Sequence, residues 1–352
     1  MSRVAELVAP RRFRLVESTF EDPGPGEVQV AVGAVGLCGS DLHSYKEGAV
    51  GDTPCVYQMV LGHEPAGTVV KTGAGVSGWG PGMRAAFEPA IYCYHCEHCL
   101  AGHHNVCAKL RFLSMPGDPG FLRERLNLPA RNLLPIPAGM GLAEATLIEP
   151  LAVVLHSMRF AQVRPGETAV VFGGGPIGLL TAVVLKLSGA GRVWVVEPVA
   201  HRRAMALQLG ADAALDPHAV DAGRTILEET SGRGVDLAID CAAMENTANQ
   251  CLQVTRHAGR VVFTGIPAEV QVPLNFHPWR RKELALYQVR RSSHESALAR
   301  ELLAAHLRRF TPLITHQRPL DGIAAAFDIA EHYSDGVGKM VIRPDTPGYS
   351  VR

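Results

Sequence analysis

The sequence has no surplus of charge of either sign, and no disordered or low-complexity composition. Its 352 residues carry 34 basic and 34 acidic side chains, so the formal net charge is zero. A protein that neutralises many phosphates needs an excess of Lys and Arg, and this balance therefore argues against a nucleic-acid partner. With 47% hydrophobic residues, the composition is that of a globular protein. A chain of this length is expected to form two domains.

The sequence also lacks the pattern of an export signal or a membrane span. The N-terminal residues 1–6 do not have the charged-then-apolar order of a signal peptide, and charges recur at Arg11 and Arg12. The uncharged stretch 168–185 contains three consecutive glycines and a proline. A strand, a glycine turn and a buried helix explain that stretch better than a transmembrane helix. We therefore expect a cytoplasmic protein without a membrane partner.

The composition and the pattern of predicted secondary structure change near residue 150. The first 150 residues are rich in Gly and Pro and contain short β-type runs, which predicts an irregular, mostly β domain. Beyond residue 150, strand and helix patterns alternate, which is typical of βαβ units and a parallel sheet. The expected elements there are strands at 168–173, 192–197, 235–240 and 260–265, with helices at 177–187, 200–209 and 246–255. A helix at 296–309 and a strand at 339–342 are expected to follow.

Four cysteines lie close together, in the pattern Cys93-x-x-Cys96-x-x-Cys99 followed by Cys107. In an unexported chain this crowding indicates a metal site before disulfides. Four thiolates from one loop are the ligand set of a tetrahedral structural zinc, with no position left open for a substrate. An iron–sulfur cluster also takes four cysteines, but the long last spacing differs from the ferredoxin pattern. We therefore predict a structural zinc.

A second set of metal-type ligands is spread along the first half of the chain. Cys38 lies in one glycine-containing segment, and His63 and Glu64 are adjacent in another. A thiolate, an imidazole and a carboxylate, with a fourth exchangeable position, are typical of a catalytic zinc. Glu149 is an alternative ligand or the acceptor for a bound water. From spacing alone, a small buried thiol at Cys38 and a hydrogen-bonded core histidine at His63 explain these residues equally well.

A glycine pattern, Gly173-x-Gly175-x-x-Gly178, follows an apolar strand and opens an apolar helix at Ile177. In such a turn the glycines let the backbone approach a pyrophosphate, which the helix N-terminus then binds. Glu197, at the end of the next strand, would accept hydrogen bonds from the adenosine ribose hydroxyls. The alternative is a glycine-rich turn that binds no ligand.

Glu197, the last residue of the expected strand 192–197, also affects the choice between NAD and NADP. A carboxylate at Glu197 would repel the additional phosphate of NADP, so we predict NAD. His201, Arg202 and Arg203 follow on the next helix, and a reoriented arginine would instead receive that phosphate. Alternatively, Arg202 would pack against the adenine ring of the cofactor.

In this order, these segments resemble the zinc-containing medium-chain dehydrogenase/reductases, specifically the polyol (sorbitol, xylitol, butanediol) dehydrogenase branch. The resemblance covers essentially the whole chain. It rests on residues 36–43, 62–64, 93–107, 148–153, 173–178 and 289–292. It implies an α/β protein with a GroES-like, mostly β catalytic domain formed by residues 1–150 and 291–352. A Rossmann domain with a doubly wound parallel sheet, residues 151–290, would lie between them and bind NAD.

The resemblance also implies a catalytic metal centre. Cys38, His63 and Glu64 match the ligands of the catalytic zinc, and Glu149 would exchange with or hold its bound water. Zinc would act as a Lewis acid on the substrate hydroxyl, and the adjacent carbon would give its hydride to the nicotinamide. Ser40 would accept the alcohol proton and pass it through the nicotinamide ribose toward His43.

Further residues are assigned by the same resemblance. Tyr45 and Arg290 match positions that meet polyol hydroxyls, although Arg290 is alternatively placed against the cofactor pyrophosphate. Gly265, at the end of a strand of the nucleotide domain, is assigned to the cofactor site. Without the resemblance, Ser40 would be assigned a local turn hydrogen bond and His43 would be a solvated surface residue.

The sequence therefore predicts an oxidoreductase that transfers a hydride from a secondary alcohol of a polyol, cyclitol or vicinal diol to NAD. Oxidation of a β-hydroxy amino acid, as in L-threonine dehydrogenases, is the alternative with closely similar metal motifs. A non-catalytic structural protein, like the lens crystallins recruited from this superfamily, is the third hypothesis. A non-catalytic protein would not need the whole set of catalytic residues, so their joint presence argues against this third hypothesis. The set comprises Cys38, Ser40, His43, His63, Glu64 and Glu149. The resemblance also implies a homo-oligomer, a tetramer or a dimer.

Overall fold

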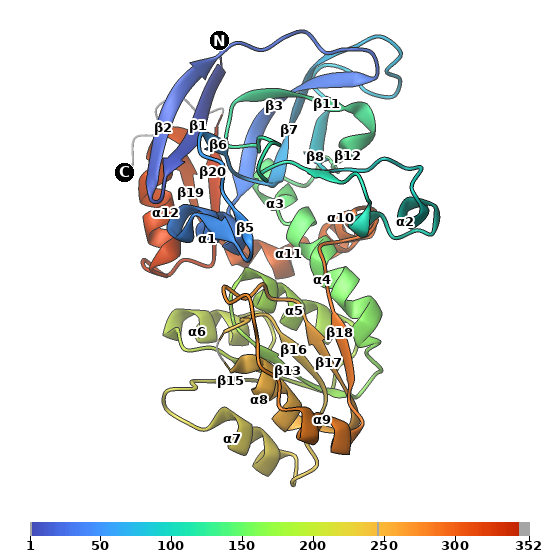
Figure 1. Cartoon of the computed structure of the whole chain (residues 1–352), viewed down its shortest axis with the longest axis vertical. Helices are drawn as coiled ribbons and strands as arrows, with labels where there is room; N and C mark the ends of the chain where they lie inside the picture. The colour runs from blue at the N-terminus through green and yellow to red at the C-terminus, as the bar shows by residue number, and fades with distance from the viewer. Residues whose placement is uncertain (1, 245, 345–352) are drawn as a thin grey trace. The chain divides into compact units, whose positions relative to one another are not determined.

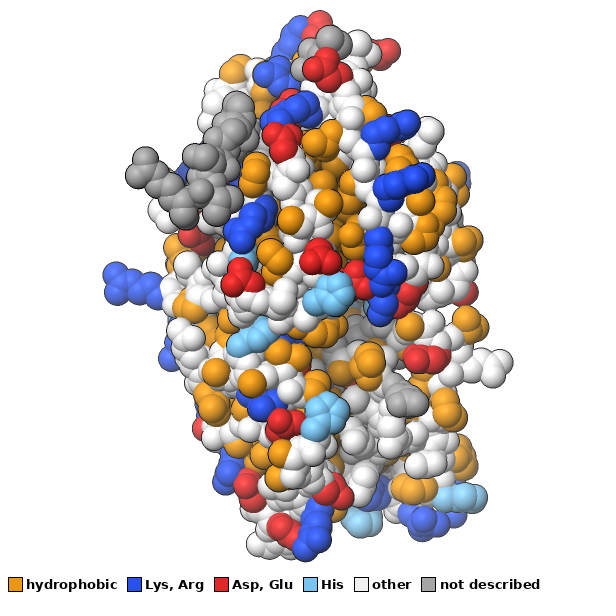
Figure 2. All heavy atoms as spheres, turned by 90° about the vertical axis from the view of Figure 1, so that its left-hand side faces the viewer, with side chains coloured by type: hydrophobic (Ala, Val, Ile, Leu, Met, Phe, Trp, Pro, Cys, Tyr) orange, Lys and Arg blue, Asp and Glu red, His pale blue; other side chains and the backbone are white. Residues whose placement is uncertain are grey.

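The computed structural model describes residues 2–244 and 246–344. The chain divides into two compact units, one comprising Met1–Ala152 with Ser293–Arg352 and the other Val153–Ser292 (Figure 1). The blue and red ends of the chain therefore share the first unit. Figure 2 shows acidic and basic side chains interspersed over one face of the molecule, as the balanced composition predicts.

The first unit is built on a mixed sheet of seven strands among the described residues, ordered β12-β8-β7-β3-β20-β19, with β11 also paired to β3. Its strands are β3 (Glu27–Gly36), β7 (Glu64–Thr72), β8 (Arg84–Phe87), β11 (Arg125–Pro129), β12 (Leu133–Pro135), β19 (Ile314–Pro319) and β20 (Lys339–Arg343). β3 is central and pairs antiparallel with β7, β11 and β20. Because β20 comes from the C-terminal segment, both chain ends complete one sheet.

Smaller strand groups and short helices surround this sheet. The smaller groups are β1 (Ser2–Ala9) with β2 (Arg12–Ser18) and β6 (Met59–Val60), β4 (Ala49–Val50) with β5 (Thr53–Pro54), and β9 (Ala90–Ile91) with β10 (Arg111–Phe112). The helices are α1 (Gly39–Glu47), α2 (Glu97–Leu100), α3 (Leu142–Ala145), α10 (Ser296–Ala305), α11 (Leu307–Phe310) and α12 (Ile323–Glu331). A further helix, α4 (Ile148–Ala161), begins in this unit and continues into the second. The core consists of branched and aromatic side chains from the sheet and the segments packed on it, such as Val30 of β3, Phe121 and Phe327 of α12, which are fully buried.

The second unit contains a six-stranded, wholly parallel sheet in the order β15-β14-β13-β16-β17-β18. Its strands are β13 (Thr168–Phe172), β14 (Arg192–Val196), β15 (Ala213–Leu215), β16 (Val235–Asp240), β17 (Thr255–Phe263) and β18 (Ala285–Gln288). Its helices are α5 (Pro176–Leu187), α6 (Ala200–Gln208), α7 (Ala222–Glu229), α8 (Thr247–Val254) and α9 (Phe276–Lys282). The strand order reverses between β13 and β16, and ligands of such sheets bind at the carboxyl ends of the strands beside this reversal.

The predicted combination of a mostly β part and an α/β part with a parallel sheet is confirmed. The uncharged stretch 168–185 forms β13, a turn and most of α5. None of the described helices is both long and apolar enough to cross a bilayer. The predicted helix 296–309 is interrupted at His306, which leaves helical geometry with φ −126° and ψ 28°, and the strand expected at 260–265 begins earlier, at Thr255.

Candidate metal centres and cofactor site

The ligand atoms of Cys38, His63 and Glu64 lie within 4.8 Å of one another. The register of two strands brings them together, since β3 and β7 pair antiparallel with Gly36 opposite Glu64. Cys38 follows the end of β3 as the N-cap of α1, and His63 precedes the first residue of β7. Both His63 and Glu64 are buried, with 6% and 1% of their surface exposed. The fold therefore assembles the three side chains that the sequence analysis grouped.

Asp41 is a member of this site that the sequence analysis missed. Its Oδ2 accepts the backbone N–H of Cys38 at 3.0 Å, and its Oδ1 accepts the N–H of Gly62 at 3.1 Å. Oδ1 also lies 3.4 Å from Nδ1 of His63, which leaves Nε2 as the ligand atom of that imidazole. A metal-binding histidine commonly gives its other N–H to a carboxylate in this way. The sequence does contain a signal for Asp41, because Asp41 is the acidic N3 residue of a helix capping box whose N-cap is Cys38.

The electrostatics of the site favour a cation. Burial opposes a charged imidazole, but the negative charges of Asp41 and Cys38 outweigh burial and raise the pKa of His63 well above its ordinary value. Burial also opposes a charged Asp41, yet His63 and the backbone donors lower the pKa of that carboxyl. A place that stabilises an extra proton in a buried setting also stabilises a metal cation.

Both carboxylate oxygens of Glu64 lie against the ammonium group of Lys339. Nζ of Lys339 donates to Glu64 Oε1 at 2.7 Å. Glu64 Oε2 is buried and forms an ion pair with the same Nζ, although it accepts no hydrogen bond from the residues that the structure describes. A buried carboxylate beside a thiol and an imidazole fits a divalent, zinc-like ion, which takes S, N and O ligands together.

Glu149 lies near this group without belonging to it. It is at the start of α4, and its carboxyl oxygens are not among the ligand atoms that cluster within 4.8 Å. Burial, together with the charges of Glu64 and Glu88, raises the pKa of Glu149 to about 8, although His63 opposes the shift. A small cavity beside it is lined by Glu149, Glu88 and Ser296, among others. Glu149 is therefore suited to holding a proton or a water near the three ligands.

The residues of α1 beyond Cys38 have different surroundings. Ser40 is half-buried, and His43, 29% exposed, has its Nδ1 2.9 Å from a carboxylate oxygen of Glu47. Tyr45 is in the core, with its ring 5.5 Å from that of Phe13 and 4.9 Å from that of Phe327. Only 5% of Tyr45 is exposed, so the structure shows a packing role for its ring, and its contact with substrate stays a prediction. Tyr45 is not included in the site that we propose.

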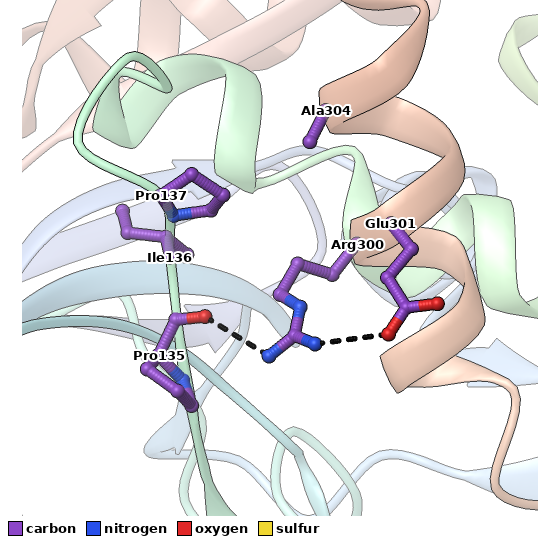
Figure 3. Close-up of a pocket in the computed structure, with 6 residues that line it drawn as sticks. All are labelled: Pro135, Ile136, Pro137, Arg300, Glu301 and Ala304. Atoms are coloured by element: carbon purple, nitrogen blue, oxygen red, sulfur yellow. Dashed lines mark hydrogen bonds and ion pairs between the residues drawn. The ribbon is translucent and has the colours of Figure 1, made fainter.

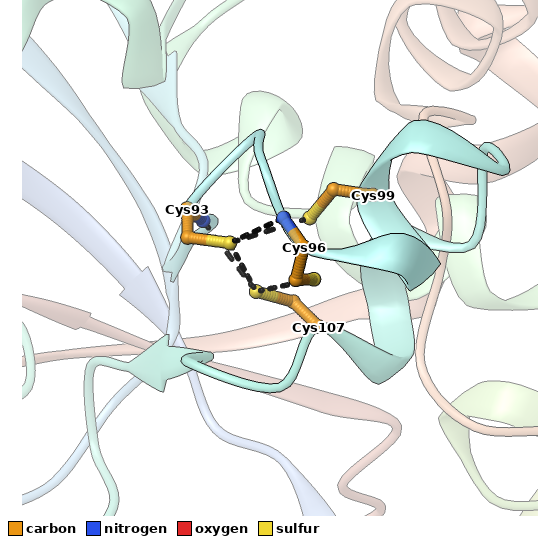
Figure 4. A group of neighbouring side chains, drawn as sticks. All are labelled: Cys93, Cys96, Cys99 and Cys107. Carbon is orange, nitrogen blue, oxygen red and sulfur yellow. Dashed lines mark hydrogen bonds between the residues drawn. The ribbon is translucent and has the colours of Figure 1, made fainter.

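The four cysteines of the second cluster converge (Figure 4). The Sγ atoms of Cys93 and Cys99 are 3.9 Å apart, those of Cys93 and Cys107 3.5 Å, and those of Cys96 and Cys107 4.0 Å. A tetrahedron with Zn–S bonds of about 2.3 Å has edges of about 3.8 Å. Each of these thiols is free. The sulfur geometry therefore fits a closed tetrahedral metal site.

Backbone donors support thiolates in this loop. The N–H groups of Cys96 and Lys109 donate to Sγ of Cys93 and Cys107, each at 3.4 Å. Backbone hydrogen bonds from Cys99 and Ala108 lower the pKa of Cys96 to about 6. Burial and the neighbouring cysteines instead raise the pKa of Cys99 to about 12, so these donors favour the thiolate at only some of the four cysteines. Zinc binds thiolates, and its binding would release the remaining thiol protons.

The glycine turn has the geometry of a phosphate-binding turn. Gly173 has φ +97°, a conformation that glycine adopts without strain. A Cβ on Gly178 would lie 1.8 Å from the carbonyl oxygen of Gly173, so only glycine allows this helix to approach the strand. Gly175 is the N-cap of α5, with open space around its Cα, and Ile177 lies in the first helical turn. Backbone at a helix N-terminus with free space beside it can receive a pyrophosphate.

Glu197 is tied to this turn. It is 4% exposed, and its two oxygens accept the N–H of Gly174 at 2.6 Å and the N–H of Val199 at 2.8 Å. Arg203 donates to the carbonyls of Glu197 and Pro198 at 2.9 and 2.7 Å. It also pairs with Asp216 at 2.8 Å, so its guanidinium is committed to protein partners.

The remaining predicted cofactor residues differ in accessibility. Arg202 is buried, with 9% of its surface exposed, and Arg290 is exposed after the end of β18. Gly265 follows β17, and its N–H donates to the carbonyl of Asp240 at 2.9 Å. A Cβ on Gly265 would lie 2.7 Å from that of Ala243, so its role is close packing at the carboxyl end of the sheet.

A separate cavity of the first unit contains none of the predicted site residues. It has a volume of about 360 Å³ and lies between β12 and α10 (Figure 3). Arg300 crosses it and contacts the carbonyl of Pro135 and the carboxylate of Glu301. The chemistry-bearing side chains are thus gathered in the two metal-type clusters and at the glycine turn.

Family models match both parts of the chain. Residues 24–138 match the alcohol dehydrogenase GroES-like domain, and residues 176–305 match the zinc-binding dehydrogenase family. The sorbitol dehydrogenase of Gallus gallus is 33% identical over 339 residues, which cover 95% of this chain and 94% of that protein.

Solved structures with nicotinamide cofactors are similar over the whole chain. A zinc-binding dehydrogenase from Sinorhizobium meliloti 1021 bound to NADP has 28% identity and a TM-score of 0.88, over 98% of this chain and 99% of that one. An alcohol dehydrogenase from Escherichia coli CFT073 in complex with NADH has 28% identity and a TM-score of 0.87, over 97% and 99%.

The fold and the matches define an oxidoreductase with a GroES-like domain and a Rossmann-type domain. The chain belongs to the zinc-containing medium-chain dehydrogenase/reductase superfamily, in its polyol dehydrogenase branch. The resemblance inferred from the sequence is thereby confirmed.

Proposed function

We propose that this protein is a zinc- and NAD-dependent dehydrogenase that oxidises a secondary alcohol of a polyol, cyclitol or vicinal diol. The observation that carries the proposal is the convergence of the ligand atoms of Cys38, His63 and Glu64 within 4.8 Å of one another. Three protein ligands leave one position of a tetrahedral ion for the substrate. The sorbitol dehydrogenase relative supports the substrate class.

The protein's own residues prepare this centre. Asp41 fixes the ring of His63 with Nε2 directed away from the carboxylate, and it holds the backbone of Cys38. When bound, the metal supplies Lewis acidity toward the substrate hydroxyl, and NAD accepts the hydride. We assign Glu149 to holding a water or a proton beside the open position, which its raised pKa of about 8 supports.

Proton release is assigned to α1. Ser40 follows Cys38 by two residues, at the start of the helix, and is proposed to accept the proton of the alcohol. His43 is partly exposed and is proposed to pass that proton to solvent. The hydrogen bond between His43 Nδ1 and Glu47 leaves Nε2 of His43 available for the transfer.

The glycine turn and Glu197 are proposed to bind NAD. Gly173, Gly175 and Gly178 would let the pyrophosphate approach the N-terminus of α5, while the carboxylate of Glu197 would face the adenosine ribose. The three contacts that hold Arg203 support a preference for NAD, because binding a 2′-phosphate would require breaking them. Arg202, Gly265 and Arg290 remain proposed cofactor residues, and Arg290 is also proposed to meet substrate hydroxyls.

Cys93, Cys96, Cys99 and Cys107 are proposed to hold a second, structural zinc. Four sulfur ligands complete a tetrahedron, so this site has no position for a substrate. We further propose a homo-oligomer, a dimer or a tetramer, and light scattering of the purified protein tests that state.

The direct test is NADH formation by the zinc-loaded protein with a panel of alcohols. The panel contains sorbitol, xylitol, a cyclitol, 2,3-butanediol, threonine and a simple secondary alcohol, each with and without a chelator. We expect chelator-sensitive activity with a polyol or diol. Activity with threonine alone would replace the proposal by the amino-acid alternative. No activity with any alcohol, in protein that holds zinc and binds NAD, would contradict the proposed reaction.

A further inference from the structure

A lysine is buried beside the proposed metal ligands. Lys339, the first residue of β20, has 1% of its surface exposed, and so does its partner Glu64. Its Nζ donates to Glu64 Oε1 at 2.7 Å and also contacts Oε2. Taking both charges out of water costs free energy, so a fully buried ion pair calls for an explanation beyond stability.

Three strands and one glycine build this pair. β3 pairs with β7 on one side and with β20 on the other, so Gly36 stands opposite Glu64 and opposite Val341. A Cβ on Gly36 would lie 2.2 Å from Glu64 Oε2 and 3.0 Å from Cε of Lys339. The absence of a side chain at Gly36 therefore provides the space in which the two charged groups meet.

Glu64 lies between Lys339 and the other two proposed metal ligands. One carboxylate oxygen is hydrogen-bonded to Lys339, while an oxygen of the same group is within 4.8 Å of the ligand atoms of Cys38 and His63. An ammonium group on a carboxylate withdraws electron density and reduces the attraction of that carboxylate for a second cation. The strength of Glu64 as a metal ligand therefore depends on Lys339.

We propose that Lys339 is a positioning residue that competes with the catalytic metal for Glu64 and thereby keeps Glu64 a weak, displaceable ligand. The inference rests on the proposed function, because it requires a metal at Cys38, His63 and Glu64. A divalent ion, one thiolate and one carboxylate sum to zero charge. Lys339 adds one positive charge, which favours the negative charge that develops on the substrate oxygen during oxidation.

The test replaces Lys339 by methionine, which keeps most of the length and removes the charge. Metal affinity of the catalytic site is measured by competition with a chromophoric chelator, and ligand geometry by the visible absorption of the Co²⁺-substituted protein. Loss of a partner of a metal ligand commonly lowers metal affinity by about 10- to 100-fold. Because Lys339 competes with the metal, we expect a change of similar size in the opposite direction, to tighter binding. We also expect an altered Co²⁺ spectrum and a lower kcat, with KM changed less.

Two further variants keep the test decisive if K339M does not fold. K339Q removes the charge but retains a hydrogen-bond donor, and it should also bind the metal more tightly. K339R retains the charge and should keep the affinity and Co²⁺ spectrum close to those of the wild type. Lys46→Met, at an exposed position of α1, is the matched control for loss of one lysine charge.

The outcomes separate the two proposals. If wild-type protein binds metal only at the four-cysteine site, the proposed function fails and this inference fails with it. If the wild type binds both metals and oxidises an alcohol, but K339M and K339Q lose only thermal stability, Lys339 has a structural role alone. In that case the inference about Lys339 is overturned and the proposed function stands.

Discussion

Asp41 Oδ1 lies 3.4 Å from His63 Nδ1, and the same carboxylate accepts the backbone N–H groups of Cys38 and Gly62. One buried acid thus fixes the two segments that carry the proposed metal ligands. It also determines which nitrogen of His63 is left to bind a metal.

Replacing Asp41 by asparagine should weaken metal binding at the catalytic site. The amide keeps the size of the side chain but loses the charge that favours a cation at His63, so we expect affinity to fall by about 10- to 100-fold. Chelator competition measures the change. Ser114→Ala removes one hydroxyl donor to Asp41 at 3.2 Å and leaves the charge in place, so its effect should be much smaller. Equal effects of the two variants would contradict the electrostatic role of Asp41.

Glu197 should determine the choice between NAD and NADP. Glu197→Gln removes the negative charge that repels a 2′-phosphate, and we expect the ratio of kcat/KM for NADP to that for NAD to rise by at least about tenfold, or ~1.4 kcal/mol. Asp216→Asn weakens one restraint on Arg203 and should raise NADP use in the same direction but less. An unchanged ratio in Glu197→Gln would rule out the carboxylate as the selecting group.

Asp236 should make stability of the second unit pH-dependent. Burial opposes its charge, but hydrogen bonds from Arg233, Thr168 and Arg256 outweigh burial and lower the pKa of Asp236 in the folded protein. The stabilisation is therefore present above the unfolded-state pKa of about 3.9 and is lost as pH falls below it.

Asp236→Asn tests this pH dependence by denaturant unfolding. We expect a loss of about 1.5–3 kcal/mol at pH 7, because the carboxylate accepts hydrogen bonds from charged groups. The difference from the wild type should shrink as the pH is lowered through 4. A difference that stays constant from pH 7 to pH 3.5 would show that the charge of Asp236 is not responsible.

The four-cysteine loop should affect stability and leave the chemistry untouched. Cys96→Ser removes one of four sulfur ligands, so we expect loss of one metal equivalent and a lower Tm, with the catalytic metal retained. Cys55→Ser is the control, because its thiol faces the carbonyl of Ser44 at 3.8 Å and belongs to neither cluster. Loss of both metals in Cys96→Ser would show that the two sites are not independent.

The sequence predicted the catalytic metal ligands through the resemblance of their segments to a known family, since spacing alone explained Cys38 and His63 equally well as core residues. Cys38, His63 and Glu64 are identifiable by residue type, and the register of β3 with β7 then brings them together. Lys339 was not predictable in this way, since its partner Glu64 is 275 residues away and the pairing of β20 with β3 has no local signature.

Other differences follow from tertiary packing. Tyr45 lies four residues after Asp41 on the buried face of α1, and contacts with Phe13 and Phe327 decide its surroundings. β17 begins at Thr255, earlier than the expected Arg260, because it pairs with the start of β16 across a register shift. Helical and strand patterns fix the type of an element, whereas neighbouring elements fix its ends.

The most direct test of the account is metal content and turnover of Cys38→Ser. We predict that this variant keeps its fold, binds NAD and retains the metal of the four-cysteine loop. It should lose the second metal equivalent and all chelator-sensitive NADH formation with the substrate of the wild type. A Cys38→Ser protein that retains two metals and full turnover would contradict the assignment of Cys38, His63 and Glu64 as the catalytic metal centre.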